Sequence, residues 1–141
     1  MSTNGITTSR VRVRYSETDQ MGVAYHTHYL VWCEVGRTEY MREVGATYAQ
    51  LEASGLFLVV AQANVRYLAP ARYDDTVRID TCLQRVQSRA VTFHYTLTRE
   101  APGPARLATA MTKLIALGAD GAPRSLPDAL LRAFRNAHAH A

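Results

Sequence analysis

The chain has 141 residues, a formal net charge of +4, 48% hydrophobic residues and 20% charged residues. This length fits one domain, which would bury roughly two-thirds of the surface that its unfolded chain exposes. No apolar stretch approaches the length of a membrane span, so composition excludes a membrane-spanning chain. We expect one soluble domain over residues 1–141.

Residues 1–9 lack the apolar core of a secretory signal, so we expect a cytoplasmic protein. Cys33 and Cys82 form no CxxC pair, which suits a reducing compartment. Every basic residue except Lys113 is an arginine, whose planar guanidinium suits phosphate groups. Because the basic residues form no adjacent run, a dispersed and solvated surface explains the charge equally well.

The first predicted element is a strand at residues 10–15, where apolar residues ending in Tyr15 alternate with arginines, so that the apolar face with Tyr15 points inward. Between residues 27 and 44, apolar residues recur at steps of three and four, which indicates a long, largely buried helix. Gly45 is its natural C-terminal stop. A capping-box spacing predicts a short second helix at residues 47–55.

Four further segments have the alternating apolar pattern of strands, and short turn-rich connections favour antiparallel pairing. An antiparallel sheet with one apolar face needs a cover, and the only long apolar helix follows the first strand. The pattern therefore predicts an α+β fold whose sheet wraps around that helix, with its core in about residues 10–117. The four segments lie near residues 57–68, 76–86, 90–99 and 105–117.

A closing helix is predicted at about residues 126–135. Ser125 would cap it, and Pro127 would lie in its first turn. We expect the tail, residues 136–141, to be frayed.

The loop before the long helix, residues 16–26, contains two carboxylates, a glycine and a histidine. Backbone N–H groups at a helix start have no partner within the helix and can hold an oxyanion. If the helix begins near His26, these amides would polarise a thioester carbonyl while Asp19 attacks it or activates a water. Gly22 would allow close approach of a substrate. The alternative is that Asp19 only caps a turn.

The segment at residues 13–29, VRYSETDQMGVAYHTHY, and the EVGR segment at residues 34–37 resemble the 4-hydroxybenzoyl-CoA thioesterase family of hotdog-fold enzymes. The similarity is greatest to its Tol-Pal-associated acyl-CoA thioesterase branch. Residues 64–75 also resemble a strand and turn of that family, and the resemblance covers about residues 10–117. It implies a five-stranded antiparallel sheet around the long helix. It also implies a homodimer or homotetramer with active sites between subunits.

The resemblance implies that Asp19 is the catalytic carboxylate. It implies that His26 presents its backbone amide to the thioester carbonyl and that its side chain assists. Residues alone leave open whether the carboxylate forms a mixed anhydride or acts as a general base. Glu17 is expected to be supporting or solvent-facing. Neither Cys33 nor Cys82 lies in the loop, so a thiolate nucleophile has little support.

Substrate binding is predicted for the loop and for the helix start. Tyrosines there would line an acyl pocket, although ordinary packing is their commoner role. The predicted residues are Gly22, Val23, Tyr25 and Tyr29, with Tyr48 as a weaker candidate.

Coenzyme A carries phosphates, so an arginine is expected near the pocket mouth. Arg89 is the predicted residue, with Arg66 and Arg72 as weaker candidates; for each, a solvated surface arginine is the alternative. Glu34 and Arg37 lie one helical turn apart and are predicted to form an ion pair that is mainly structural.

We expect neither a metal nor a cofactor, because the histidine pairs have no acidic or cysteine partners at zinc-site spacing. Those histidines are His26, His28, His138 and His140. The predicted function is hydrolysis of an aliphatic or aromatic acyl-CoA to free acid and CoA. A non-catalytic module that binds acyl-CoA or acyl carrier protein is the alternative. Nucleic acid is not expected as a partner, because no DNA-reading element is present.

Overall fold

The computed structural model describes residues 5–139, so predictions that concern residues 1–4 or His140 lie outside the described residues. The elements follow the predicted order, with one extra 3₁₀ turn, η1, before the long helix. They are β1 (Thr7–Arg12), η1 (Tyr15–Glu17), α1 (His28–Val44), α2 (Tyr48–Ala53), β2 (Leu56–Tyr67), β3 (Thr76–Val86), β4 (Ala90–Ala101), β5 (Ala105–Gly118) and α3 (Asp128–His138).

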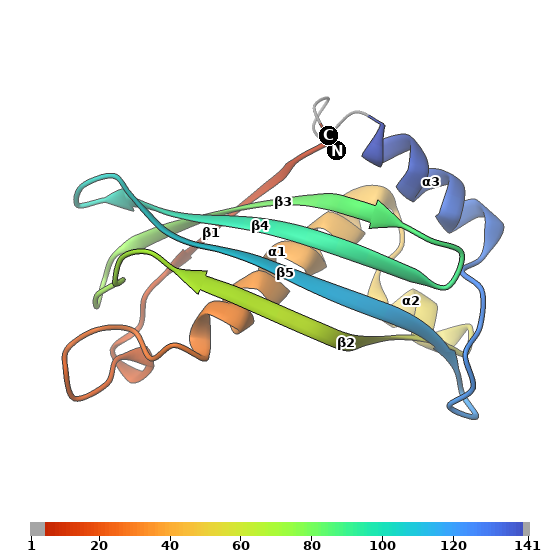
Figure 1. Cartoon of the computed structure of the whole chain (residues 1–141), viewed down its shortest axis with the longest axis horizontal. Helices are drawn as coiled ribbons and strands as arrows, with labels where there is room; N and C mark the ends of the chain where they lie inside the picture. The colour runs from red at the N-terminus through yellow and green to blue at the C-terminus, as the bar shows by residue number, and fades with distance from the viewer. Residues whose placement is uncertain (1–4, 140–141) are drawn as a thin grey trace.

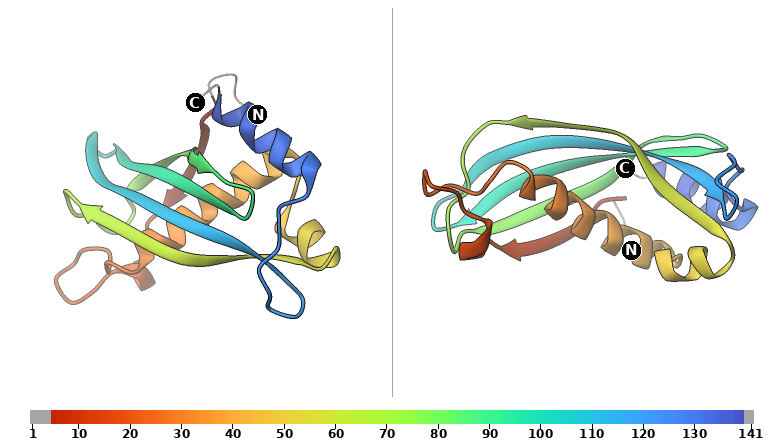
Figure 2. Two further views of the ribbon diagram at one scale, coloured as in Figure 1. Left: turned by 45° about the vertical axis from the view of Figure 1, so that its right-hand side comes forward. Right: turned by 90° about the horizontal axis from the view of Figure 1, so that it is seen from below.

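The five strands form one antiparallel sheet in the order β1-β3-β4-β5-β2. The sheet arches over α1, which crosses its concave face, and β1 and β2 form the two edges (Figures 1 and 2). This is the α+β hotdog architecture that the sequence predicts. Among the described residues, no helix has both the length and the apolar character needed to cross a membrane.

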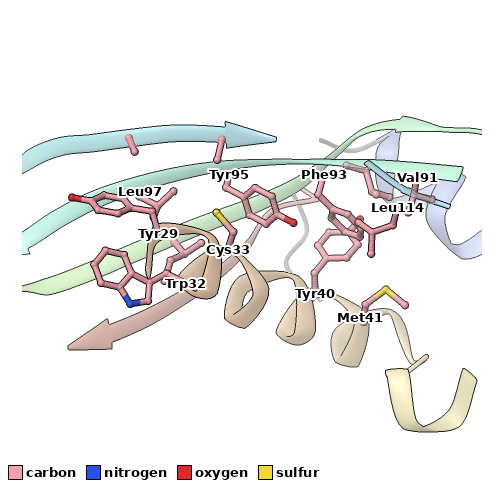
Figure 3. Close-up of a cluster of buried hydrophobic side chains, with 14 of the residues drawn as sticks. Tyr29, Trp32, Cys33, Tyr40, Met41, Val91, Phe93, Tyr95, Leu97 and Leu114 are labelled. Carbon is pink, nitrogen blue, oxygen red and sulfur yellow. The ribbon is translucent and has the colours of Figure 1, made fainter. Parts of the chain in front are cut away.

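The core lies between α1 and the concave face of the sheet (Figure 3). Alternation along β4 points Phe93, Tyr95 and Leu97 inward, and all three are fully buried. Gly36 lets α1 approach β3 closely: a Cβ there would lie 2.8 Å from Ile79 Cγ2 and closer still to the hydroxyl of Thr81. The α1 residues that Figure 3 labels in this core are Tyr29, Trp32, Cys33, Tyr40 and Met41.

The first strand begins earlier and ends earlier than predicted. Val13 is buried as expected, and its backbone pairs with the turn at Asp74 and Asp75 instead of with a strand. The chain then enters η1, which leaves Tyr15 77% exposed. The inward orientation predicted for Tyr15 was therefore wrong, because the alternation stops where the 3₁₀ turn begins.

The closing helix also differs from its prediction. Pro127 occupies the N-cap position, and Ser125 makes no cap because the N–H of Leu126 donates to the carbonyl of Ser88, which keeps this segment extended. The helix continues to His138 instead of fraying after residue 135. Buried Ala137 packs this additional turn against the core.

Candidate active site

The loop before α1 folds back on itself as a narrow hairpin. Thr18 forms an antiparallel bridge with Ala24, and the N–H of Asp19 donates to the carbonyl of Val23 at 2.9 Å. Gly22 turns the chain with φ of +80°, and its N–H donates to the carbonyl of Asp19 at 3.0 Å. This positive φ is a sufficient reason for a glycine at the tip.

The Asp19 side chain lies half-exposed on this hairpin. Its Oδ1 accepts the N–H of Met21 at 2.9 Å, which is the turn-capping contact considered as the alternative to catalysis. Within residues 5–139, its Oδ2 has no hydrogen-bond donor. One carboxylate oxygen therefore holds the turn while the other is available for chemistry.

α1 begins at His28, one residue after the predicted start at residue 27, with Thr27 as an N-cap whose side chain accepts no capping hydrogen bond. The N–H groups of His28 and Tyr29 donate to the carbonyls of Tyr25 and His26 at 3.0 and 3.3 Å. In the described part of the chain, the N–H groups of His26 and Thr27 have no acceptor. Two adjacent amide donors are thus available at the start of the helix.

A cavity of about 320 Å³ adjoins this helix start. Tyr67, from the end of β2, forms one wall, and its hydroxyl donates to the carbonyl of His26 at 2.8 Å. The Tyr67 ring meets the Tyr29 ring edge to face, with centroids 5.0 Å apart. The lining residues are Val23, Ala24, His26, Tyr29, Tyr67, Leu68, Ala69 and Pro70.

Some of the predicted site residues line this cavity, and others do not. Val23, His26 and Tyr29 line it, whereas Asp19, Gly22 and Tyr25 do not. Tyr25 is half-exposed, and its ring packs against the His26 ring at a centroid distance of 4.4 Å. Tyr29 is a structural wall, because its hydroxyl accepts the N–H of Ala71 at 3.1 Å and burial raises its pKa.

Tyr67 is a site residue that the sequence analysis missed. It lies in the segment that resembles the thioesterase family, but strand alternation only indicates which face of the sheet it occupies. Its contact with His26 spans 41 positions of the chain. That contact follows from the position of the end of β2 beside the start of α1, which only the folded chain reveals.

Glu17 is buried, so the solvent-facing prediction was wrong and the supporting one fits. Its Oε1 accepts the backbone N–H of Arg14 at 2.8 Å, and its Oε2 accepts the indole N–H of Trp32 at 3.1 Å. Burial works to raise the pKa of this carboxyl, but the two hydrogen bonds and the Arg14 charge outweigh it and lower the pKa.

The predicted phosphate-binding arginine lies far from the cavity. Arg89 is in the turn between β3 and β4, at the opposite end of the sheet from the Asp19 hairpin (Figure 1). It lines a separate hollow of about 280 Å³ together with Lys113. Arg72 lies closer to the hairpin, since it forms an antiparallel bridge with Val23. A single chain therefore does not bring Arg89 and His26 together.

The predicted Glu34–Arg37 ion pair was wrong: no contact within 4.0 Å joins their charged groups. Arg37 instead turns into the core, where it donates to the hydroxyls of Tyr48 at 2.7 Å and Tyr95 at 3.2 Å. Tyr48 therefore holds Arg37 and is absent from the cavity lining. Burial raises the pKa of Cys33 to about 12, which disfavours a thiolate there.

The side chains that could bind a metal ion are not clustered in the described part of the chain. Across residues 5–139, no group of three or more His, Cys, Asp or Glu side chains is arranged to hold a metal ion. The groups that this region presents are the Asp19 oxygen without a donor, the His26 and Thr27 N–H groups without an acceptor in the described chain, and the adjoining cavity.

The family of this chain follows from its similarity to known proteins. A family model described as the thioesterase-like superfamily matches residues 13–134. A putative acyl-CoA thioesterase of Bacillus subtilis, YneP, is 39% identical over 79 residues, which cover 56% of this chain and 57% of that protein. The acyl-CoA thioester hydrolase YbgC of Escherichia coli O157:H7 is 37% identical over 83 residues, which cover 59% and 62%. The matched part therefore spans less than two-thirds of these relatives.

Solved structures extend the similarity across the chain. The hypothetical protein TT1821 of Thermus thermophilus aligns with a TM-score of 0.87 at 33% identity, over 94% of this chain and 98% of that one. A 4-hydroxybenzoyl CoA thioesterase aligns with a TM-score of 0.82 at 17% identity, over 91% and 97%, and shows the shared fold alone. Membership of the Tol-Pal-associated branch stays a prediction. The chain belongs to the thioesterase-like superfamily, as a hotdog-fold member of the 4-hydroxybenzoyl-CoA thioesterase family.

Proposed function

We propose that this protein is an acyl-CoA thioesterase, which converts an acyl-CoA and water to a free acid and CoA. One observation carries the proposal: the His26 and Thr27 amides lack acceptors in the described chain, and His26 lines a cavity beside the Asp19 hairpin. The names of the B. subtilis and E. coli relatives support the same activity.

In this mechanism the thioester carbonyl oxygen accepts hydrogen bonds from the helix-start amides, which stabilise the negative charge that develops on it. Asp19 supplies the second component through the oxygen that does not hold the turn. As a general base it takes a proton from the attacking water. As a nucleophile it forms a mixed anhydride that water then hydrolyses. In both routes the CoA thiolate leaves and is protonated.

The proposed active unit is a homo-oligomer built on a dimer through β2. α2 packs against β2, and β2 pairs with β5 along one side only, which leaves its other side as an unpaired edge with Val59 and Val60 exposed by 42% and 46%. A long, apolar and unpaired edge strand favours pairing with another chain. Antiparallel pairing of β2 with the β2 strand of a second protomer, about a two-fold axis, would place the end of one strand beside the beginning of the other. Opposite ends of the two protomers would then lie side by side. This pairing would thereby bring the partner subunit's Arg89 toward His26 and the CoA phosphates.

The assay offers short, long and aromatic acyl-CoA thioesters to the purified protein and follows release of free thiol. Asp19→Asn retains an oxygen that accepts the N–H of Met21 but loses the carboxylate. We expect it to lower kcat by about 100-fold or more, within the range of general acid–base contributions. If Asp19→Asn hydrolyses thioesters at the wild-type rate, the proposed role of Asp19 is overturned.

Asp120→Asn is the matched control. Asp120 makes the same kind of turn, since its Oδ1 accepts the N–H of Ala122 at 3.0 Å, and Gly121 follows it with φ of +80°. This control should leave hydrolysis unchanged. If the wild type binds acyl-CoA or acyl carrier protein but hydrolyses no thioester, the non-catalytic binding module is correct instead. We also propose a cytoplasmic location, because Cys33 and Cys82 are free.

A further inference from the structure

The Glu17 carboxylate joins two segments that flank the Asp19 hairpin. One oxygen accepts the backbone N–H of Arg14, at the end of the segment that leads into the loop. The other accepts the indole N–H of Trp32, on the second turn of α1. Both donors and the carboxylate lie at one wall of a groove of about 300 Å³ that is separate from the cavity lined by His26.

The main chain of Glu17 also holds the loop. Its carbonyl accepts the N–H of Tyr25 at 2.8 Å, and Tyr25 directly precedes His26. Two residues after Glu17, Asp19 begins its turn. A rotation of Glu17 would therefore move both the carboxylate of Asp19 and the peptide that carries the His26 N–H. The Arg14 guanidinium and the His28 imidazole face the carboxylate as well: Arg14 Nε lies 3.5 Å and His28 Nδ1 lies 3.9 Å away.

We propose that Glu17 is a positioning residue, which sets the placement of the Asp19 carboxylate relative to the helix-start amides through its bonds to Arg14 and Trp32. The catalytic consequence rests on the proposed thioesterase function. Nothing in the chemistry requires Glu17 to touch the substrate. Its role is geometric, and it depends on two acceptor oxygens that point at two donors.

Glu17→Gln tests this requirement sharply. A glutamine has one acceptor oxygen, so its NH₂ group must face either the Arg14 N–H or the Trp32 indole N–H, both of which are donors. The variant therefore loses one of the two hydrogen bonds that the charged carboxylate accepts and leaves a buried donor unpaired, which is costly. We expect kcat to fall about tenfold and KM to stay within about twofold of wild type. Trp32→Phe removes one donor and retains a ring, and we expect it to lower kcat about threefold.

The double variant Glu17→Gln/Trp32→Phe removes the clash, because the NH₂ group then faces a ring that has no N–H. We expect its kcat to be no lower than that of Glu17→Gln, whereas independent effects would multiply to about 30-fold. Multiplication of the two effects, or a Glu17→Gln variant with kcat within about twofold of wild type, would overturn the proposal. Glu52→Gln, on the exposed face of α2, is the matched control and should leave kcat unchanged.

A second readout does not depend on activity. Trp32 is the only tryptophan, so its indole N–H gives one identifiable NMR signal. In Glu17→Gln we expect this N–H to exchange with solvent at least about tenfold faster, and the His26 and Thr27 amide signals to move. Unmoved His26 and Thr27 signals would overturn the positioning role even if the wild type proves inactive. Wild-type inactivity would instead refute only the thioesterase proposal.

Discussion

The Tyr67 hydroxyl donates a 2.8 Å hydrogen bond to the backbone carbonyl of His26, which ties the end of β2 to the start of α1. This carbonyl belongs to the same planar peptide unit as the N–H of Thr27, one of the two amides without an acceptor in the described chain. A bond to one side of a rigid peptide fixes the direction of the donor on its other side. Tyr67 therefore orients a proposed oxyanion donor.

Tyr67→Phe should lower kcat about threefold to tenfold, because one neutral hydrogen bond contributes about 1 kcal/mol and each 1.4 kcal/mol corresponds to about tenfold in rate. The ring remains, so the cavity wall and KM should change little. Steady-state thiol-release kinetics measure both parameters. Tyr73→Phe is the control, since Tyr73 is exposed and its ring contacts Tyr15. Equal kinetics for the two variants would show that the bond has no catalytic role.

Gly36→Ala should destabilise the fold at the crossing of α1 and β3. The added methyl group would lie 2.8 Å from Ile79 Cγ2 and even closer to Thr81 Oγ1, and overpacking of this kind costs about 1–3 kcal/mol. Denaturant unfolding measures the loss. Gly103→Ala is the control, because a Cβ there meets no atom within 4 Å.

Thr81→Ala should restore part of the stability lost in Gly36→Ala. The Thr81 hydroxyl is buried without a hydrogen-bond partner in the described structure, so its removal sacrifices no bond and makes room for the methyl group. Recovery should be incomplete, since Ile79 still crowds the site. A double variant as unstable as the sum of its single variants would contradict direct contact between positions 36 and 81.

The sequence predicts the strands and α1 well because their periodicities reflect burial on one face. Alternation places Phe93 and Leu97 in the core, and both are buried. The pattern fails where backbone geometry changes. Alternation carried on through Tyr15 would point that ring into the core, but η1 intervenes, leaves Tyr15 exposed and places the Glu17 carboxylate inside instead.

Site contacts between distant positions are not encoded in any local pattern. Helical spacing pairs Glu34 with Arg37, yet the Arg37 guanidinium lies in the core and donates to two tyrosine hydroxyls, whereas Glu34 stays exposed. The hairpin that presents Asp19 was recognised through its resemblance to a family. Its connection to Tyr67 required the fold.

Acid should lower the free energy of unfolding, in part because it protonates the Glu17 carboxylate. Its pKa in the folded protein lies below the ordinary value of 4.5, so near that pH the unfolded state binds more protons than the folded state. The stabilising contribution is therefore fully present above about pH 4.5 and is lost as the pH falls through the lowered pKa. Urea unfolding at a series of pH values should show a shallower acid slope for Glu17→Gln than for wild type. The slope for Glu52→Gln should match wild type, and parallel curves for all three proteins would refute the prediction.

Val60→Lys should separate the proposed dimer. Val60 lies on the open edge strand β2 and is 46% exposed in the single chain, so a lysine fits the isolated protomer. At a β2–β2 interface, two copies would bring like charges together and bury them, which opposes pairing. Light scattering should give about twice 15.7 kDa for wild type and about 15.7 kDa for the variant. Its kcat/KM should fall at least about tenfold as the partner subunit's Arg89 leaves the site.

Ala129→Lys is the control for the same change of charge. Ala129 is exposed on α3, which packs against β3. We expect it to keep both the wild-type mass and the wild-type kinetics. A wild type that is monomeric and fully active would refute the shared site. A Val60→Lys dimer would instead locate the interface elsewhere, and Arg89 would then need another route to the CoA phosphates.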